Sequence, residues 1–372
     1  MTYTTKYKSL LLLIISVFLI NCSSDNDGPV DEQPEEVSPV VFDINAVPYA
    51  KLSDYNFFKG NISDLDPVYG VLPFQPASQL FTDYALKKRF IWMPDDVSAT
   101  YQSDAKVLNF PTGTVLIKNF YYENVLPDNS KKIIETRLMI RKANEWIFAN
   151  YIWNEQQSDA DYDVDMTGGN LNVEWTQNGT ATTVNYRIPS QGECMICHSN
   201  NQSIVPIGPK PQNLNFPINF ADGNQNQLEK LKDFGYISNE IPGNIVSTVD
   251  YQDTSKSLDL RARSYLDINC AHCHTEGGTS QQYPVRFAFT QTPNYETLGF
   301  CQETNFMLNF FPQGVNKIIY PGDHLQSIVH YRMNATPGDG PMMMPYIGRS
   351  LVHTEAVSVV DAWINSFEEG CD

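Results

Sequence analysis

Cys194-Met195-Ile196-Cys197-His198 and Cys270-Ala271-His272-Cys273-His274 are two copies of one short pattern, and they divide the chain into its two expected parts. In each copy, two cysteines stand three positions apart and a histidine follows directly. Thiols at this spacing can add to the two vinyl groups on one edge of a haem, with the next histidine under the iron as proximal ligand. We therefore expect two covalently bound haem c groups, attached through Cys194, Cys197, Cys270 and Cys273 and ligated by His198 and His274.

A zinc site built from both Cys-x-x-Cys pairs is the main alternative. Zinc does not require a histidine directly after each pair. With 6 histidines in 372 residues, two such neighbours would arise by chance in roughly 3 of 10,000 cases. The pattern therefore favours haem.

The N-terminus indicates export from the cytoplasm. Two lysines precede an apolar run from Leu10 to Ile20, which is too short for a comfortable transmembrane helix. Residues 1–21 are therefore predicted to be a signal peptide. The run ends in Leu19-Ile20-Asn21-Cys22, which resembles a lipobox. This resemblance implies that Cys22 carries a lipid anchor at the cell envelope, in the outer membrane facing the periplasm or the cell surface. An ordinary signal peptide cut elsewhere is the alternative.

The next segment and the net charge bear on partners. Residues 22–41 are rich in Asp, Glu, Ser and Pro and are predicted to be a disordered tether, because they cannot bury enough apolar surface to fold. The formal charge of -18 argues against nucleic acid or an anionic membrane surface as the partner. It fits steering toward a basic patch on a redox partner protein, although an acidic surface also serves solubility.

Two of the seven cysteines are left after these assignments. Cys22 would take the lipid and four cysteines would take haem, which leaves Cys301 and Cys371. In an oxidising compartment, two leftover cysteines suggest a disulfide. Two free buried thiols are the alternative.

Residues 42–225 are expected to form a β-rich domain that contains the first motif. Segments rich in β-branched and aromatic residues predict its strands, at Arg89–Met93, Thr114–Phe120, Glu135–Ile140, Trp146–Trp153 and Thr182–Tyr186. Residues 167–170 contain two glycines and an asparagine and are predicted to be a turn.

Residues 226–372 are expected to form an all-helical domain, so the fold class is α+β. Helices are predicted at Asn224–Phe234 and at Ser257–Asn269, the second running directly into Cys270. At the end of the chain, Thr354 is expected to cap an amphipathic helix and Gly370 to stop it.

A methionine-rich loop offers a second axial ligand to the second haem. Gly340-Pro341-Met342-Met343-Met344-Pro345 resembles the methionine loop of class I cytochromes c, where a Met-Pro pair presents sulfur to iron. Met344 matches that pair, with Met343 and Met342 as fallbacks. Methionines that only fill core space are the alternative. Arg332 is a candidate partner for a haem propionate, or an exposed arginine.

The first motif has no such loop after it. Met139, Met166 and Met307 are possible sixth ligands without support from spacing. The remaining histidines, His324, His330 and His353, lie in the second half of the chain. A five-coordinate haem, or one with a ligand other than methionine, is therefore an open option.

From about residue 80 onward, the chain resembles a poorly characterised bacterial family of dihaem c-type cytochromes. The resemblance rests on Phe81-Thr82-Asp83-Tyr84-Ala85, Phe110-Pro111-Thr112-Gly113-Thr114, Ile134-Glu135-Thr136-Arg137-Leu138, Pro206-Ile207-Gly208-Pro209-Lys210 and Ala271-His272-Cys273-His274. It implies two haems and little more.

A second, local resemblance is more mechanistic. The segment from Phe110 to Lys118 is similar to a strand of the cytochrome P460 family, in which a tryptophan-containing strand and a Cys-x-x-Cys-His motif follow. In those enzymes the lysine matching Lys118 is cross-linked to a five-coordinate haem that oxidises hydroxylamine. The related cytochromes c′-β lack the cross-link and bind small gases. The cytochrome P460 pattern also includes a carboxylate on the distal side of the haem. This chain has Arg137 near that position, with Glu135 two residues away.

These observations give one leading function and two rivals. We expect a dihaem electron carrier without enzymatic activity. The first rival is a haem oxidoreductase of the cytochrome P460 or peroxidase type, with a catalytic first haem near Lys118, Glu135 and Arg137. The second rival is a module that binds a small ligand at the first haem.

Overall fold

A computed structural model describes residues 36–238, 241–368 and 370–371. The predicted signal peptide, Cys22 and most of the tether lie outside the described residues. Within the described ranges, no helix is long and apolar enough to cross a membrane.

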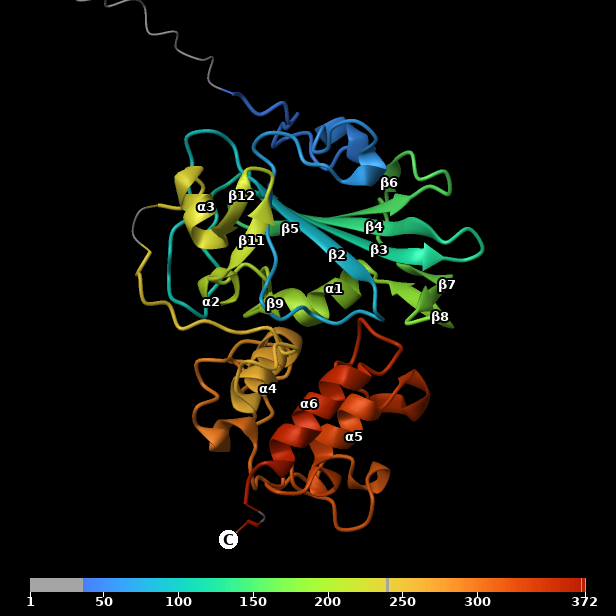
Figure 1. The fold of residues 1–372 in the computed structure, drawn as a ribbon, viewed down its shortest axis with the longest axis vertical. Coiled ribbons are helices and arrows are strands. Elements are labelled where there is room, and N and C mark those ends of the chain that lie inside the picture. The colour runs from blue at the N-terminus through green and yellow to red at the C-terminus, as the bar shows by residue number, and fades with distance from the viewer. Residues whose placement is uncertain (1–35, 239–240, 369, 372) are drawn as a thin grey trace, which may run out of the picture. The chain divides into compact units, whose positions relative to one another are not determined.

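An eight-stranded antiparallel sheet forms most of the first half of the chain (Figure 1). Six strands follow one another in the order β1-β2-β3-β4-β5-β6, and β7 joins β3 and β8. The strands are β1 (Leu72–Pro73), β2 (Leu86–Trp92), β3 (Val115–Val125), β4 (Ser130–Arg141), β5 (Trp146–Trp153), β6 (Ala160–Tyr162), β7 (Gly169–Gln177) and β8 (Thr180–Ile188). Helices accompany this sheet, so the mixed α and β fold class is confirmed at this level.

The five predicted strands overlap β2, β3, β4, β5 and β8. The turn predicted at 167–170 is wrong for its last two residues, because β7 begins at Gly169. This strand pairs with β8 from Gly169 opposite Ile188 to Gln177 opposite Thr180. Its inward residues Val173 and Trp175 are buried. Pairing along the whole strand, together with the burial of these two residues, overrides the turn preference of its first residues.

The two faces of the sheet pack into different cores. Ile117 and Leu138 point into a core with the N-terminal segment around Leu52. Their neighbours Leu116 and Met139 point to the opposite face, because successive side chains in a strand alternate. This second face carries the residues of the candidate site.

Short helices and strands pack on both faces of the sheet. They are η1 (Leu52–Tyr55), η2 (Ile62–Asp64), α1 (Gln191–His198), β9 (Ser199–Asn200), β10 (Ser203–Ile204), α2 (Pro211–Leu214), β11 (Pro217–Phe220), β12 (Gly223–Asn226) and α3 (Gln227–Asp233). The helix expected from Asn224 thus begins only after the β11–β12 hairpin, and Asn226 caps it by accepting hydrogen bonds from Leu228 N and Glu229 N.

The expected domain boundary at residues 225/226 cuts through a packed core. Leu228 and Leu231 of α3, followed by Tyr236 and Ile237, pack with residues of the sheet's second face. The core of the C-terminal part begins at Tyr251. Sequence alone placed the boundary too early because α3 is amphipathic and looks like the first helix of the following domain.

The C-terminal part contains helices joined by long irregular segments. They are α4 (Leu258–Leu266), the π-helical turn η3 (Asp267–Ala271), η4 (Tyr295–Leu298), η5 (Leu308–Phe310), η6 (His324–Gln326), α5 (Ile328–Asn334), η7 (Pro337–Met342) and α6 (Thr354–Asn365). Isolated bridges such as Phe300 with Ile319 interrupt the helical character. The last helix differs from expectation at both ends, since its N-cap is His353 and its C-cap is Ser366.

Buried polar contacts join the two parts within one compact unit of residues 37–372. The Asn269 side-chain oxygen accepts a hydrogen bond of 2.8 Å from Phe81 N. Asp83 accepts 2.6 Å and 2.7 Å bonds from the backbone of Ser350 and Leu351. Because these groups are shielded from water, losing a partner would leave a buried polar group unsatisfied. The contacts therefore fix α4 and its motif against the sheet.

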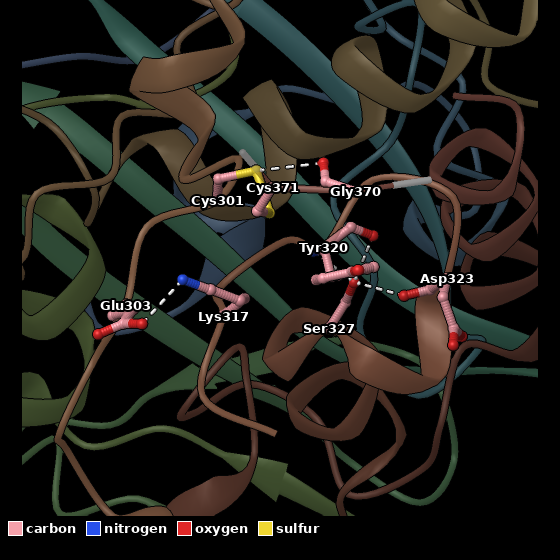
Figure 2. The surroundings of a disulfide bond; sticks show 8 residues. All are labelled: Cys301, Glu303, Lys317, Tyr320, Asp323, Ser327, Gly370 and Cys371. Carbon is pink, nitrogen blue, oxygen red and sulfur yellow. Dashed lines mark hydrogen bonds and ion pairs between the residues drawn. A yellow bond between two sulfur atoms is a disulfide. The ribbon is translucent and has the colours of Figure 1, made fainter. Parts of the chain in front are cut away.

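A disulfide closes the last loop of the chain. Cys301 and Cys371 are bonded across a sequence separation of 70, with their Cα atoms 5.4 Å apart. Figure 2 shows the bond beside Gly370 and near the turn formed by Tyr320, Asp323 and Ser327. The bond ties the segment after η4 to the chain end that follows α6.

Candidate functional site

The first motif forms helix α1 directly after strand β8. Ser190 Oγ accepts a hydrogen bond from Glu193 N, and the Glu193 carboxylate accepts one from Ser190 N. This reciprocal cap starts the helix, and Arg187 holds Glu193 through two further bonds. Cys194, Cys197 and His198 follow within two turns.

The hydrogen bonding and burial of the His198 ring suit it to coordinate a metal. Its Nδ1 donates a 2.8 Å hydrogen bond to the carbonyl of Val205, which leaves Nε2 free. Burial lowers the pKa of His198 to about 3, so the ring is neutral, the form that binds iron. A carbonyl partner on the other ring nitrogen is the usual way in which proteins orient a ligating histidine.

The second motif continues α4 through the π-helical turn η3. Ser257 caps α4 by accepting a 3.3 Å bond from Leu260 N, and Cys270 lies within η3. Burial lowers the pKa of His274 to about 4. Its Nδ1 is buried and has no hydrogen-bond partner among the described residues.

The two motifs touch each other. The carbonyl oxygen of Ile196 accepts a 2.8 Å hydrogen bond from Thr279 Oγ1 and a 3.4 Å bond from Cys273 Sγ. One ligand atom each from Cys197, His272 and Cys273 lies within 4.8 Å of the others. The other two motif cysteines do not join this group. A single four-cysteine zinc site is therefore not formed by the described chain.

A cavity of about 420 Å³ opens beside the second motif. Cys270, Cys273 and His274 line it together with Met344. The rest of its wall is largely apolar and includes Val285, Phe287, Ile328, Val329, Met333 and Val357. The thiols and imidazole of the second motif and the thioether of Met344 thus face a single space, of a size common for small-molecule sites, that Cys197, His272, His353 and Met333 also line. This donor set fits a haem with histidine and methionine as axial ligands.

Only one of the three methionines in the loop is placed as a candidate ligand. Met344 lines the cavity, whereas Met343 and Met342 do not. Met344 N donates a 2.9 Å bond to the carbonyl of Arg332. The Arg349 guanidinium donates a 2.7 Å bond to the carbonyl of Met344.

Arg349 was not identified from the sequence. It is 6% exposed, and it also bonds the carbonyls of Arg332, Met333 and Leu351. An arginine inside the apolar segment that follows Pro345 is the signal that could have found it. Arg332 itself lines the same cavity, as its proposed contact with a propionate requires.

A smaller cavity, of about 160 Å³, lies between the first motif and the sheet. Cys194, Cys197 and His198 line it, and Lys118 and Arg137 form part of the opposite wall. This donor set fits a haem held by two thioethers and one histidine. The volume is below the usual range for an enclosed ligand. A whole haem would therefore extend beyond this cavity.

A row of cations crosses the sheet at this cavity. Arg89 on β2 lies opposite Lys118 on β3, which lies opposite Arg137 on β4. Directly paired residues share one face of the sheet. Burial, reinforced by Arg89 and Arg137, lowers the pKa of Lys118 well below its usual value. The Lys118 side chain makes no hydrogen bond or ion pair with any described residue and lies 4.7 Å from the centre of the Phe120 ring, so the wall suits an anionic group such as a haem propionate.

Glu135 stands behind this row instead of lining the cavity. Its carboxylate accepts two hydrogen bonds from Arg137 and a 2.7 Å bond from the Tyr186 hydroxyl. The Glu135 side chain is fully buried. The carboxylate therefore holds Arg137 in position.

The structure places the candidate sixth ligands of the first haem in different regions. Met139 lines the first cavity, whereas Met166 and Met307 line neither cavity. His353 lines the second cavity. His324 and His330 form a separate cluster with Asp361.

The two cavities share part of their walls. The residues common to both are Cys197, Asn269, His272, Pro345, Ile347 and Arg349. The two candidate haem sites are therefore immediate neighbours.

Comparisons with protein-family models, with curated proteins and with solved structures found no match to this chain.

The ion pair behind the cation row gives a test of the site's construction. We expect Glu135→Gln to lower the free energy of unfolding by about 3 kcal/mol, because Arg137 loses its buried counter-ion. The exposed Glu174 on β7 is a matched control, and Glu174→Gln is expected to change stability by less than about 0.5 kcal/mol. Urea denaturation measures both. Equal effects of the two substitutions would show that the pair does not organise the wall.

Proposed function

We propose that this protein is a dihaem c-type cytochrome that passes electrons to or from a redox partner at the cell envelope. The observation that carries the proposal is that each Cys-x-x-Cys-His set lines one cavity and that the two cavities share a wall. When bound, each haem would supply an iron that takes up and releases one electron.

The chain's own residues account for the rest of the second site. Cys270, Cys273, His274 and Met344 would hold the haem. A methionine ligand beside the histidine would raise the reduction potential of the iron, which would favour electron transfer over catalysis.

The shared wall supports transfer between the two sites. Cys197 and Cys273 would each carry a thioether, and their sulfur atoms belong to one group of close ligand atoms. Asn269 and His272 fill the space around them in both cavities. Electrons could therefore pass from one site to the other inside the protein, without a second docking event.

The first cavity favours a second candidate function. Among the described residues, Met139 is the one methionine that lines it. Lys118 and Arg137 form a basic wall that could donate hydrogen bonds to negative charge near the first haem. This arrangement supports a haem oxidoreductase, or a module that binds a small ligand, with the second site supplying or removing electrons.

The proposal also covers the family of each part of the chain and the location of the protein. We infer that the sheet part is related to cytochrome P460 and cytochrome c′-β, and that the C-terminal part corresponds to a class I cytochrome c domain. Cys22 would anchor the chain to the membrane by its lipid. The charge of -18 suits a redox partner with a basic docking patch.

Counting haems tests the leading proposal. The pyridine haemochrome spectrum and the intact mass of the mature protein should both report two haems. The double variants Cys194→Ser/Cys197→Ser and Cys270→Ser/Cys273→Ser should each lose one. The pair Cys301→Ser/Cys371→Ser removes the same number of sulfur atoms and should keep both haems. Wild-type protein without haem, matured in a host that attaches haem c, would contradict the proposal.

The Met344 ligand predicts a change in potential. We expect Met344→Ala to lower the potential of the second haem by on the order of 0.1 V, a fraction of the roughly 0.8 V range that axial ligands span. The open position should also bind added imidazole. Met343→Leu alters a neighbouring methionine outside the cavity and should change neither property. Spectroelectrochemistry measures both variants, and equal potentials would exclude Met344 as ligand.

Spectroscopy of the first site decides between the two candidate functions. In the His274→Ala variant, the ferric EPR signal of the first haem can be compared with that of the wild type. A low-spin, six-coordinate first haem, lost in Met139→Ala, is expected for an electron carrier. High-spin iron that reacts with peroxide, hydroxylamine or nitric oxide would instead support the second candidate.

A further inference from the structure

A cluster of metal-binding side chains lies away from both cavities. One nitrogen each of His324 and His330 and one carboxylate oxygen of Asp361 lie within 4.8 Å of one another. None of the three lines either cavity, so both candidate haem sites leave them unused. We propose that these residues bind a divalent transition-metal ion of the zinc class.

Three separate elements bring the ligands together. His324 lies in η6, His330 in α5 and Asp361 in α6. His330 Nδ1 is 2.9 Å and 3.0 Å from the two carboxylate oxygens of Asp361. The rings of His324 and His330 lie with their centroids 4.8 Å apart, at an interplanar angle of 76°.

The side chains are shielded but accessible. The side chains of His330 and Asp361 are 16% and 18% exposed, so an ion could enter from solvent while most water is excluded. Zinc binds imidazole nitrogen and carboxylate oxygen at roughly 2.0–2.2 Å. Small side-chain rotations would close the group onto a single ion.

Neighbouring amides hold two of the ligands in place. Asn365 stands one turn after Asp361 on α6, and its side-chain oxygen accepts a 3.0 Å bond from His324 N and lies 3.1 Å from His324 Nδ1. Asn334 stands one turn after His330 on α5 and donates a 3.0 Å bond to the His330 carbonyl. Such outer contacts orient the ligands of metal sites.

The backbone around His324 is also fixed. Asp323 caps η6 by accepting a 2.8 Å bond from Leu325 N, and Gly322 N donates a 3.0 Å bond to the carbonyl of Ile364 in α6. Figure 2 shows Asp323 on the turn near the Cys301–Cys371 disulfide. The entry to η6 is thus tied to the end of α6, where Asp361 lies.

The ligand set selects a class of ion. Two imidazoles and one carboxylate are the set found in open zinc sites and in some non-haem iron sites. Magnesium and calcium prefer oxygen ligands alone. A bound ion would clamp α5 to α6, and α5 also supplies Arg332 and Met333 to the wall of the second cavity.

Zinc titration of the metal-stripped mature protein tests this site. The protein carries no histidine tag, and isothermal titration calorimetry measures binding of Zn²⁺. We expect one equivalent to bind here, and His324→Ala, His330→Ala and Asp361→Ala each to weaken it at least tenfold. Asp128→Ala, on an exposed hairpin turn, should bind like the wild type. Mg²⁺ should not compete. Unchanged zinc binding in all three ligand variants would overturn the proposal.

Two further measurements make the test independent of the haem proposal and of the variants' folding. Cys197→Ser/Cys273→Ser removes the other group of possible metal ligands, and it should retain the zinc equivalent at His324, His330 and Asp361. In wild-type protein, bound Cu²⁺ should show EPR hyperfine coupling to two imidazole nitrogens. A copper signal without nitrogen coupling would contradict the assignment.

Discussion

The contact between the two Cys-x-x-Cys-His segments is the constraint on which the site depends. The Ile196 carbonyl in α1 accepts a hydrogen bond from Thr279, which follows the second motif. Asn269, just before the second motif, is bonded to Phe81 N beside the sheet. The bond between Asn269 and Phe81 is buried, so losing it would leave an unsatisfied polar group between the two parts. Two sites that are separate in sequence thus become neighbours with a common wall.

The basic residues that suit the first cavity to bind an anion also destabilise the fold. Three basic side chains cross one face of the sheet, and Glu135 compensates only Arg137 directly. A buried lysine without a counter-ion is costly, and Lys118 has no ion-pair partner among the described residues. Such local conflicts with folding are expected at functional sites. A negatively charged haem edge would resolve this one, which links the charge pattern of the sheet to the proposed cofactor.

Local features of the sequence were predictable, and long-range ones were not. Strand composition located β2 to β5 and β8, and cysteine spacing located both motifs. The start of β7, the place of α3 in the first core, and the role of Arg349 depend on packing between distant segments. The same holds for the shared wall and for His324, His330 and Asp361, whose spacing follows no metal-binding motif. No periodicity in a single sequence encodes these contacts.

If this fold holds two haems side by side, as we propose, their irons should interact magnetically. EPR spectra of the fully oxidised protein can be compared with those of protein in which only the second haem has been reduced. Adjacent haems predict that the signal of the first iron changes its shape or relaxation when its neighbour becomes diamagnetic. Spectra of the oxidised protein that are the simple sum of two independent signals would contradict the account.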